Sequence, residues 1–481
     1  MKLLYTFILI FSFGHSFAQS VINWSPEIDI ASSSYSNLHP RIVADRTGNP
    51  MVIWGNFSNS EINFSRWDGT TFTTPIILNP SNLPVFTASW AGPDMASHGD
   101  TVYVVIKQTP EDTNHVFLMR SFDGGITFSA PVQVDHLTDS ASRFPTVAAD
   151  SIGNPIVSYM KFEQGFINAA YVVARSNDFG MTFSNDVLAS SYLGENVCDC
   201  CPATIVSSGS YGAMLYRDNF NDFRTIWCGV STDNCASFPF GMQVDQTGWQ
   251  INACPSTGPD GVIIGDSIYT VFMSGQTGDA RCYISASSLT QSVAGPTREL
   301  TDSTAFVSNQ NYPRIAHAGN KVAVVCKQIN STFDGQLAFF YTDDIYSGLP
   351  QTYDSLAMGN ITNGDVEMTA DAIHVVWQDD NSETVKYRKG TFSPTQINNL
   401  GVEKLVIYPT PSKDKFSIIP NKNTTVTSVE LIDALGQTML IPFSSSASSI
   451  DCNLKNISPG LYLVKVLQSD SSFLLGKIVV Q

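Results

Sequence analysis

Two eight-residue stretches, residues 121–128 and 176–183, share the pattern Ser-x-Asp-x-Gly-x-Thr-Phe, and this repeat restricts the fold more than any other feature. The Ser and Asp side chains can accept hydrogen bonds from nearby backbone amides, and the Gly allows a positive φ. The Thr-Phe pair then returns the chain to a strand whose ring packs inward. The pattern therefore predicts a repeated hairpin turn. Its defined positions are Ser121, Asp123, Gly125, Thr127, Phe128, Ser176, Asp178, Gly180, Thr182 and Phe183.

A longer repeat surrounds these turns. Seven segments of roughly 50 residues each contain two apolar runs rich in β-forming residues, separated by a Gly/Asn/Asp/Ser turn. Most open with an x-Pro pair, and they begin at His39-Pro40, Gly92-Pro93, Phe144-Pro145, Cys201-Pro202, Cys254-Pro255, Tyr312-Pro313 and the proline-less Asp365-Val366. The spacing predicts an all-β propeller over residues 19–400, with four strands in each blade. Val21–Ile30 is expected to close the ring.

Both eight-residue turns match the Asp-box (BNR) repeat of sialidase-like β-propellers at every defined position. The resemblance implies that fold, with the boxes structural and distant from the active face. Sialidases of this group usually have six blades, whereas the repeat here favours seven.

The N-terminal segment indicates export, and the net charge limits the possible partners. Lys2 precedes an apolar run from Leu3 to Phe13, and Ser16-Phe17-Ala18 fits a cleavage site, so residues 1–18 are expected to be a signal peptide. No later run is long enough for a transmembrane segment. The net charge of −17 argues against nucleic acid or an anionic membrane as a partner.

The repeat stops near residue 400, and residues 401–481 contain short strands separated by turns, which predicts a small β-sandwich. This region resembles the C-terminal sorting domain of type IX secretion cargo in Bacteroidetes. The resemblance implies that the type IX machinery carries the protein across the outer membrane, to the cell surface or the medium, and that the domain is usually removed. An ordinary accessory β-domain is the alternative.

The residues after the repeat-opening prolines are expected to form a ring on one face of the propeller, where propellers normally bind ligands. The ring so predicted is Arg41, Asp94, Thr146, Ala203, Ser256, Arg314 and Glu367. Arg314, Glu367, Arg41 and Asp94 would then alternate in charge on consecutive blades. Two interpretations remain open at this stage: ion pairs between blades, or a substrate-binding cluster.

The sialidase resemblance also implies catalytic roles, which we assign by position in the repeat. Arg41, Arg314 and either Arg143 or Arg217 would bind a carboxylate, Asp94 would be the acid, and Tyr312 with Glu367 would be the nucleophile pair. The family's Arg-Ile-Pro motif has no clean match in this sequence, and the most similar tripeptide is Arg143-Phe144-Pro145 in the third repeat. Trp249, which precedes Cys254 in the sequence, is a candidate sugar platform, and a tryptophan of the core is the equally weighted alternative.

The cysteines form an unusual cluster. Cys198, Cys200 and Cys201 precede the fourth repeat, and Cys254 opens the fifth. In an exported protein, disulfides are the default expectation. We therefore expect a bridge from this cluster to Cys254, and a second bridge between Cys228 and Cys235. A copper or zinc site at Cys198–Cys201 and Cys254 and other thiol chemistry are the alternatives. Nothing else in the sequence indicates a cofactor.

These features predict a secreted or cell-surface propeller that recognises or processes extracellular glycans, with an exo-sialidase-like glycoside hydrolase as the enzymatic form. A non-catalytic adhesion or protein-binding propeller and a thiolate metal-binding protein are the alternatives. An enzyme should present its acid and arginine side chains in an open pocket. A scaffold should pair them in salt bridges.

Overall fold

The computed structural model describes residues 20–31, 35–137, 140–163, 165–194, 196–302, 305–393, 405–419, 425–433, 436–446, 449–469 and 473–481. The chain divides into two compact units, Met1–Ser393 and Pro394–Gln481. The predicted signal peptide, residues 1–18, and the predicted boundary near residue 400 lie outside the described residues.

The described part of the first unit contains seven β-sheets, six of four strands and one of five. Blade 1 contains β3 (Asn37–Ala44), β4 (Pro50–Asn56), β5 (Glu61–Arg66) and β6 (Ile76–Ile77). Blade 2 contains β7 (Asp94–His98), β8 (Thr101–Lys107), β9 (Val116–Ser121) and β10 (Val132–Gln133). Blade 3 contains β11 (Ala141–Ala149), β12 (Pro155–Glu163), β13 (Ile167–Arg175) and β14 (Val187–Leu188). Blade 4 contains β15 (Thr204–Ser208), β16 (Tyr211–Arg217), β17 (Ile226–Ser231) and β18 (Phe240–Gln243).

The remaining three blades continue this order. Blade 5 contains β19 (Asp260–Ile264), β20 (Ser267–Ser274), β21 (Arg281–Ser288) and β22 (Thr297–Glu299). Blade 6 contains β23 (Ser308–Ala318), β24 (Lys321–Ile329), β25 (Gly335–Thr342) and β26 (Asp354–Met358), with the short 3-10 helix η1 (Ile345–Ser347) before β26. Blade 7 contains β27 (Ile361–Met368), β28 (Ala372–Asp379), β29 (Thr384–Phe392), β1 (Ile22–Trp24) and β2 (Ile28–Asp29).

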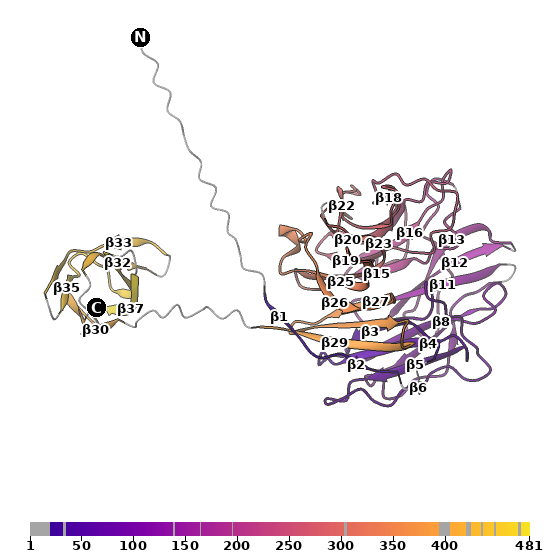
Figure 1. Cartoon of the computed structure of the whole chain (residues 1–481), viewed down its shortest axis with the longest axis horizontal. Coiled ribbons are helices and arrows are strands. Elements are labelled where there is room, and N and C mark those ends of the chain that lie inside the picture. The colour runs from indigo at the N-terminus through magenta and orange to yellow at the C-terminus, as the bar shows by residue number, and fades with distance from the viewer. Residues whose placement is uncertain are drawn as a thin grey trace, which may run out of the picture. The chain divides into compact units, whose positions relative to one another are not determined.

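The sheets form a closed ring. The first strands of successive blades, from β3 to β27, are neighbours around the centre, and β27 lies against β3. The N-terminal strands β1 and β2 pair antiparallel with β29, so both ends of the unit share one blade (Figure 1). The predicted all-β propeller, its seven blades and the closure of the ring by Val21–Ile30 are confirmed.

The blades pack face to face, and each interface between neighbours has its own apolar core. The second strands are buried on both faces, as in β8, where Val102 to Ile106 are completely buried. Such continuous apolar runs are expected where neighbours cover both faces of a sheet. One core joins blades 3 and 4 around Tyr171 and Tyr216, and another joins blades 4 and 5 around Leu215 and Phe272.

The two eight-residue turns connect the third and fourth strands of blades 2 and 3. In the first, the Ser121 hydroxyl accepts from the Gly125 amide at 2.9 Å, and the Asp123 carboxylate accepts from the Thr127 amide at 2.9 Å. Gly125 has φ +77°. The second turn repeats these contacts, and its Gly180 has φ +80°.

The turns lie at the end of the blade where the first strand finishes. The Gly124 amide donates to the carbonyl of Asp100 in the β7–β8 connection, and the Phe179 amide donates to the side chain of Asn154 in the β11–β12 connection. Phe128 packs edge-on against Phe64 of blade 1, with ring centroids 4.9 Å apart. The turns therefore attach each blade to the preceding one.

Adjacent glycines in the first turn provide a matched test of this attachment. Gly124 and Gly125 both have positive φ, but a Cβ at Gly125 would overlap the Phe64 ring, whereas a Cβ at Gly124 would meet open space. We expect Gly125→Val to lower the free energy of unfolding by about 1–3 kcal/mol more than Gly124→Val, because only the first adds overpacking to backbone strain. Urea unfolding measures both. Equal losses would mean that the contact with blade 1 contributes nothing.

The C-terminal unit is a two-sheet sandwich. One sheet has the order β30 (Val406–Tyr408), β31 (Lys415–Ile419), β35 (Ile450–Asn453) and β34 (Phe443–Ser445). The other has the order β33 (Thr438–Leu440), β32 (Val426–Ile432), β36 (Gly460–Gln468) and β37 (Phe473–Val480). Alternate residues of β36, such as Val464 and Val466, are buried between the sheets.

Candidate binding site at the channel mouth

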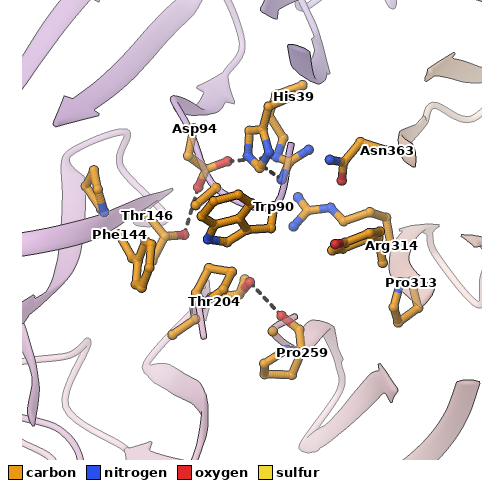
Figure 2. Close-up of a pocket in the computed structure, with 18 residues that line it drawn as sticks. His39, Trp90, Asp94, Phe144, Thr146, Thr204, Pro259, Pro313, Arg314 and Asn363 are labelled. Atoms are coloured by element: carbon orange, nitrogen blue, oxygen red, sulfur yellow. Dashed lines mark hydrogen bonds and ion pairs between the residues drawn. The ribbon is translucent and has the colours of Figure 1, made fainter. Parts of the chain in front are cut away.

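A pocket lies where the first strands begin, around the axis of the ring. Its volume is about 60 Å³, well below the roughly 300–1,000 Å³ of typical ligand pockets. Figure 2 shows this pocket. The residues that line it include His39, Trp90, Asp94, Phe144, Thr146, Tyr312, Arg314 and Asn363, which come from five blades and a connecting loop.

Irregular backbone directs several of these side chains into the mouth. The register of the first two strands shifts just before the ring position in blades 1, 3, 6 and 7. His39, Phe144 and Tyr312, each preceding a repeat proline, have φ of 56°, 50° and 49°. Bulges and positive φ at non-glycine residues re-aim side chains and concentrate at functional sites.

The strand register corrects three members of the predicted ring. Arg41 pairs across to Ile53 in β4, and the equivalent pairings in blades 5 and 7 belong to Asp260 and Asp365. The fifth repeat therefore opens at Gly258-Pro259 rather than Cys254-Pro255, and the expected Ser256 and Glu367 lie outside the ring position. In blade 4 the position belongs to Thr204, one residue after the expected Ala203.

The three aspartates of the corrected ring bind the next blade in the same way. Asp365 accepts from the Ile42 amide at 3.0 Å, Asp94 from the Val147 amide at 3.1 Å, and Asp260 from the Ile315 amide at 2.9 Å. In each case the donor follows the ring residue of the next blade. A carboxylate on one first strand thus satisfies a backbone amide on its neighbour.

The two ring arginines lie among these carboxylates. Nε of Arg314 lies 2.8 Å from Asp365 and 3.4 Å from Asp260. Arg41 lies farther from its acid, 3.8 Å from Asp94, and donates to the His39 ring at 2.7 Å. Burial, followed by repulsion from Arg314, lowers the pKa of Arg41 to about 10. Ion pairing between blades, one of the two interpretations of the ring, is therefore present.

Three groups in the pocket remain available to a ligand. The hydrogen bond and ion pairs of Arg314 run through Nε, so its two Nη groups donate to no described residue. The side chain of Asn363 is 3% exposed, and its Nδ2 has no hydrogen-bond partner among the described residues. The half-buried Trp90 ring lies in the middle of the view of the pocket, which Arg314 also lines (Figure 2). The sequence does not point to Trp90 or Asn363, because neither follows the proline that opens a repeat.

The residues assigned to a nucleophile pair line different cavities. Tyr312 lines the mouth pocket, while Glu367 lines a second cavity of about 320 Å³ farther along the axis, with Asp260, Arg314, His317 and Asp365. Burial, and then repulsion from Asp365, raises the pKa of Glu367 to about 8. Asp94, the assigned acid, lies in the mouth and accepts from the Thr146 hydroxyl at 2.7 Å.

The other predicted ligand-binding residues do not line the mouth pocket. Arg217 is 0% exposed, and its guanidinium donates to the carbonyls of Arg224 and Met273 at 2.6 and 2.8 Å. Trp249 is buried in the core shared by blades 5 and 6. Arg143 packs on the Phe144 ring, with its guanidinium carbon 4.2 Å from the ring centroid. It also pairs with Glu111 and donates to the Asp199 carbonyl.

The structure contains a disulfide between Cys200 and Cys254, which joins the loops that precede blades 4 and 5. The expected bridge between Cys228 and Cys235 is wrong, because both are free thiols that belong to different cores. Cys228 lies in the core of blades 4 and 5, and Cys235 in that of blades 3 and 4, on the other face of the sheet.

The sulfurs of Cys198, Cys200 and Cys201 lie within 4.8 Å of one another. With Cys200 in the disulfide, two free thiols remain in this group, fewer than the four ligands of a structural zinc site. The described geometry therefore fits a metal only if the disulfide is first reduced.

Comparison with known proteins identifies the second unit. Residues 406–481 match the secretion system C-terminal sorting domain. These residues form a type IX sorting domain, which directs the chain to export. It is exported to the cell surface or the extracellular space, and the secretion machinery is one of its partners. No helix in the described part of the chain has the length and apolar character of a membrane span.

For the propeller, a search of curated proteins found no match. Among solved structures, a protein of unknown function from Dyadobacter fermentans has a TM-score of 0.45 at 10% identity, covering 77% of this chain and 99% of that one. The Trypanosoma rangeli sialidase in complex with the inhibitor DANA has a TM-score of 0.42 at 10% identity, covering 92% and 85%. The Fusarium graminearum GH93 α-L-arabinofuranosidase has 0.45 at 11%, covering 77% and 98%. Likenesses this distant assign no activity.

The raised pKa of Glu367 predicts a pH dependence of stability. An unfolded glutamate titrates near 4.5, whereas Glu367 titrates near 8 in the folded protein. Between these values the folded state holds a proton that the unfolded chain has released, so stability falls as pH rises. We expect Glu367→Gln to raise the free energy of unfolding near pH 8 by on the order of 1–3 kcal/mol, and to change it little near pH 4.5. Urea unfolding at both pH values measures the difference.

The exposed Glu163 in β12 provides the control. Glu163→Gln should change stability equally at the two pH values. A pH-independent effect of Glu367→Gln would contradict the burial of an ionisable carboxyl in this cavity.

Proposed function

We propose that the exported propeller recognises the acidic terminal unit of an extracellular glycan at the channel mouth and does not hydrolyse it. The observation that carries this proposal is a pair of free donor groups in a pocket that an aromatic ring also lines. The donors are the Nη groups of Arg314 and Nδ2 of Asn363, and the ring is that of Trp90. Two donors can hold a carboxylate, and the indole can pack on the apolar face of a sugar ring.

The size of the pocket supports recognition of one group rather than enclosure of a whole sugar. A volume of about 60 Å³ accepts a carboxylate or a hydroxyl, while most of the sugar stays outside the pocket. Hydrolases normally exclude water around the reacting bond. A shallow contact of this kind fits binding better.

The arrangement of the charged residues favours binding over catalysis for a second reason. Asp94, Asp260 and Asp365 each accept a backbone amide of the neighbouring blade, so they already serve as structural acceptors. The tyrosine and glutamate of the implied nucleophile pair line separate cavities. A hydrolytic propeller, with Asp94, Tyr312 and Glu367 in the roles assigned above, remains the alternative.

Binding can be tested with a matched pair of sugars, galacturonic acid and galactose, together with N-acetylneuraminic acid. We expect calorimetry to detect an acidic sugar and not galactose, because only the acids present a carboxylate to Arg314. Trp90→Ala and Asn363→Ala should each weaken binding about tenfold, which is 1.4 kcal/mol. Trp67→Ala, at a half-buried tryptophan outside the pocket, is the control and should bind as the wild type does. Equal affinity for galactose and galacturonic acid would contradict the proposal.

Turnover is tested with aryl glycosides of the same acids, and we expect no release of the aryl group. Release that is lost in Tyr312→Phe and Asp94→Asn would establish the hydrolase instead.

Export makes a separate prediction. Protein recovered from its native host should begin near Gln19 and lack most residues after about 400, because the signal peptide and the sorting domain are removed in passage. Intact-mass measurement checks both ends. A chain deleted of residues 406–481 should remain inside the outer membrane, and its appearance in the medium would contradict a sorting role.

A further inference from the structure

Four cysteine sulfurs meet beside the mouth pocket and differ in their access to solvent. Cys254 is exposed and Cys200 is half-buried, and these two form the disulfide. Cys198 and Cys201 are completely buried thiols. An oxidant in solution can therefore reach the outer pair but not the inner pair.

The inner thiols are in contact with the outer bridge. Sγ of Cys198 lies 3.5 Å from Sγ of Cys200 and 2.8 Å from Sγ of Cys201. Sγ of Cys201 lies farther from Cys200, at 4.0 Å. A tight turn holds this arrangement, with the Cys201 amide donating to the Cys198 carbonyl at 3.2 Å. Cys198 is thus placed to attack Cys200, and Cys201 to attack Cys198.

The electrostatics distinguish the two inner thiols. A hydrogen bond from Cys201, together with the charges of Arg217 and Arg224, lowers the pKa of Cys198 to about 7. Burial raises the pKa of Cys201. Because the thiolate is the nucleophile in disulfide exchange, Cys198 is the better attacking group of the pair.

We propose that these four cysteines form a thiol–disulfide exchange relay, which passes oxidation from the exposed Cys200–Cys254 bridge to the buried Cys198–Cys201 pair. First, the Cys198 thiolate attacks Sγ of Cys200. The Cys198–Cys200 bond forms, the Cys200–Cys254 bond breaks, and Cys254 leaves as a thiolate.

In the second step the sulfur of Cys201 attacks Sγ of Cys198. The Cys198–Cys201 bond forms, the Cys198–Cys200 bond breaks, and Cys200 leaves as a thiol that carries the proton of Cys201. One disulfide is consumed and one is formed, so the exchange itself needs no oxidant. A small or protein disulfide in the exporting compartment then accepts two electrons from Cys200 and Cys254 and restores the outer bridge. The final state carries both bridges.

The decisive comparison is between two inner-pair variants. In Cys201→Ser, the first step occurs but cannot be resolved, so exposed Cys254 becomes a free thiol. In Cys198→Ser the attacking thiolate is missing. We expect a maleimide to label Cys254 of the native, metal-free chain at least ten times faster in Cys201→Ser than in Cys198→Ser. Equal labelling rates would overturn the relay.

The end state is tested on the full wild-type chain with oxidised glutathione, followed by alkylation in denaturant and peptide mass spectrometry. Cys198 and Cys201 should both resist alkylation. In Cys200→Ser, which lacks the middle link, both should remain alkylatable. Cys228→Ser, at a buried thiol of another core, is the control and should behave as the wild type. Wild-type protein in which Cys198 and Cys201 stay alkylatable, or in which the four cysteines hold stoichiometric copper or zinc, would overturn the proposal.

Discussion

The contact on which the propeller depends is the one between an aspartate at the start of one blade and a backbone amide at the start of the next. It occurs at Asp94, Asp260 and Asp365, with distances of 2.9–3.1 Å. The first strands of neighbouring blades belong to separate sheets, so amides that are not bonded within their own sheet need other acceptors. A carboxylate is a strong acceptor for this purpose. Arg314 then offsets the charge of two of the three aspartates.

This use of the charged residues determines what remains for a ligand. The ring aspartates Asp94, Asp260 and Asp365 each accept a backbone amide of the neighbouring blade. Arg314 is held through Nε, which leaves its outer nitrogens free. The binding groups are therefore those that the ring does not need: the far end of one arginine, the amide of Asn363 and the Trp90 ring. Arg314 thus connects three blades through its ion pairs and presents donors to the pocket.

How far the sequence predicted the site differs from residue to residue. Arg41, Asp94 and Arg314 were found because each follows a proline in a regular repeat, and the structure brings them together at the mouth. Asp260 and Asp365 were missed. In the fifth repeat two x-Pro pairs stand four residues apart, and in the seventh there is none. In these two repeats the sequence therefore does not show which residue occupies the ring position. A two-residue error in a strand keeps a side chain on the same face but moves it along the channel. Asp365 and Glu367 accordingly line the same deeper cavity. Trp90 and Asn363 belong to a loop and a bulge, for which local pattern gives no position.

The sequence by itself determined the all-β propeller, its seven blades, the closing N-terminal strand and the sorting domain. These follow from local chemistry, because turn residues, β-forming runs and their spacing act within one repeat. Only the tertiary structure decided which cysteines pair, which arginines are buried and which charges meet. Cys228 and Cys235 are close in sequence yet belong to cores on opposite faces of one sheet, while Cys200 and Cys254 are joined across two blades. Such pairings depend on the register and rotation of whole blades around the axis, and no single repeat contains that information.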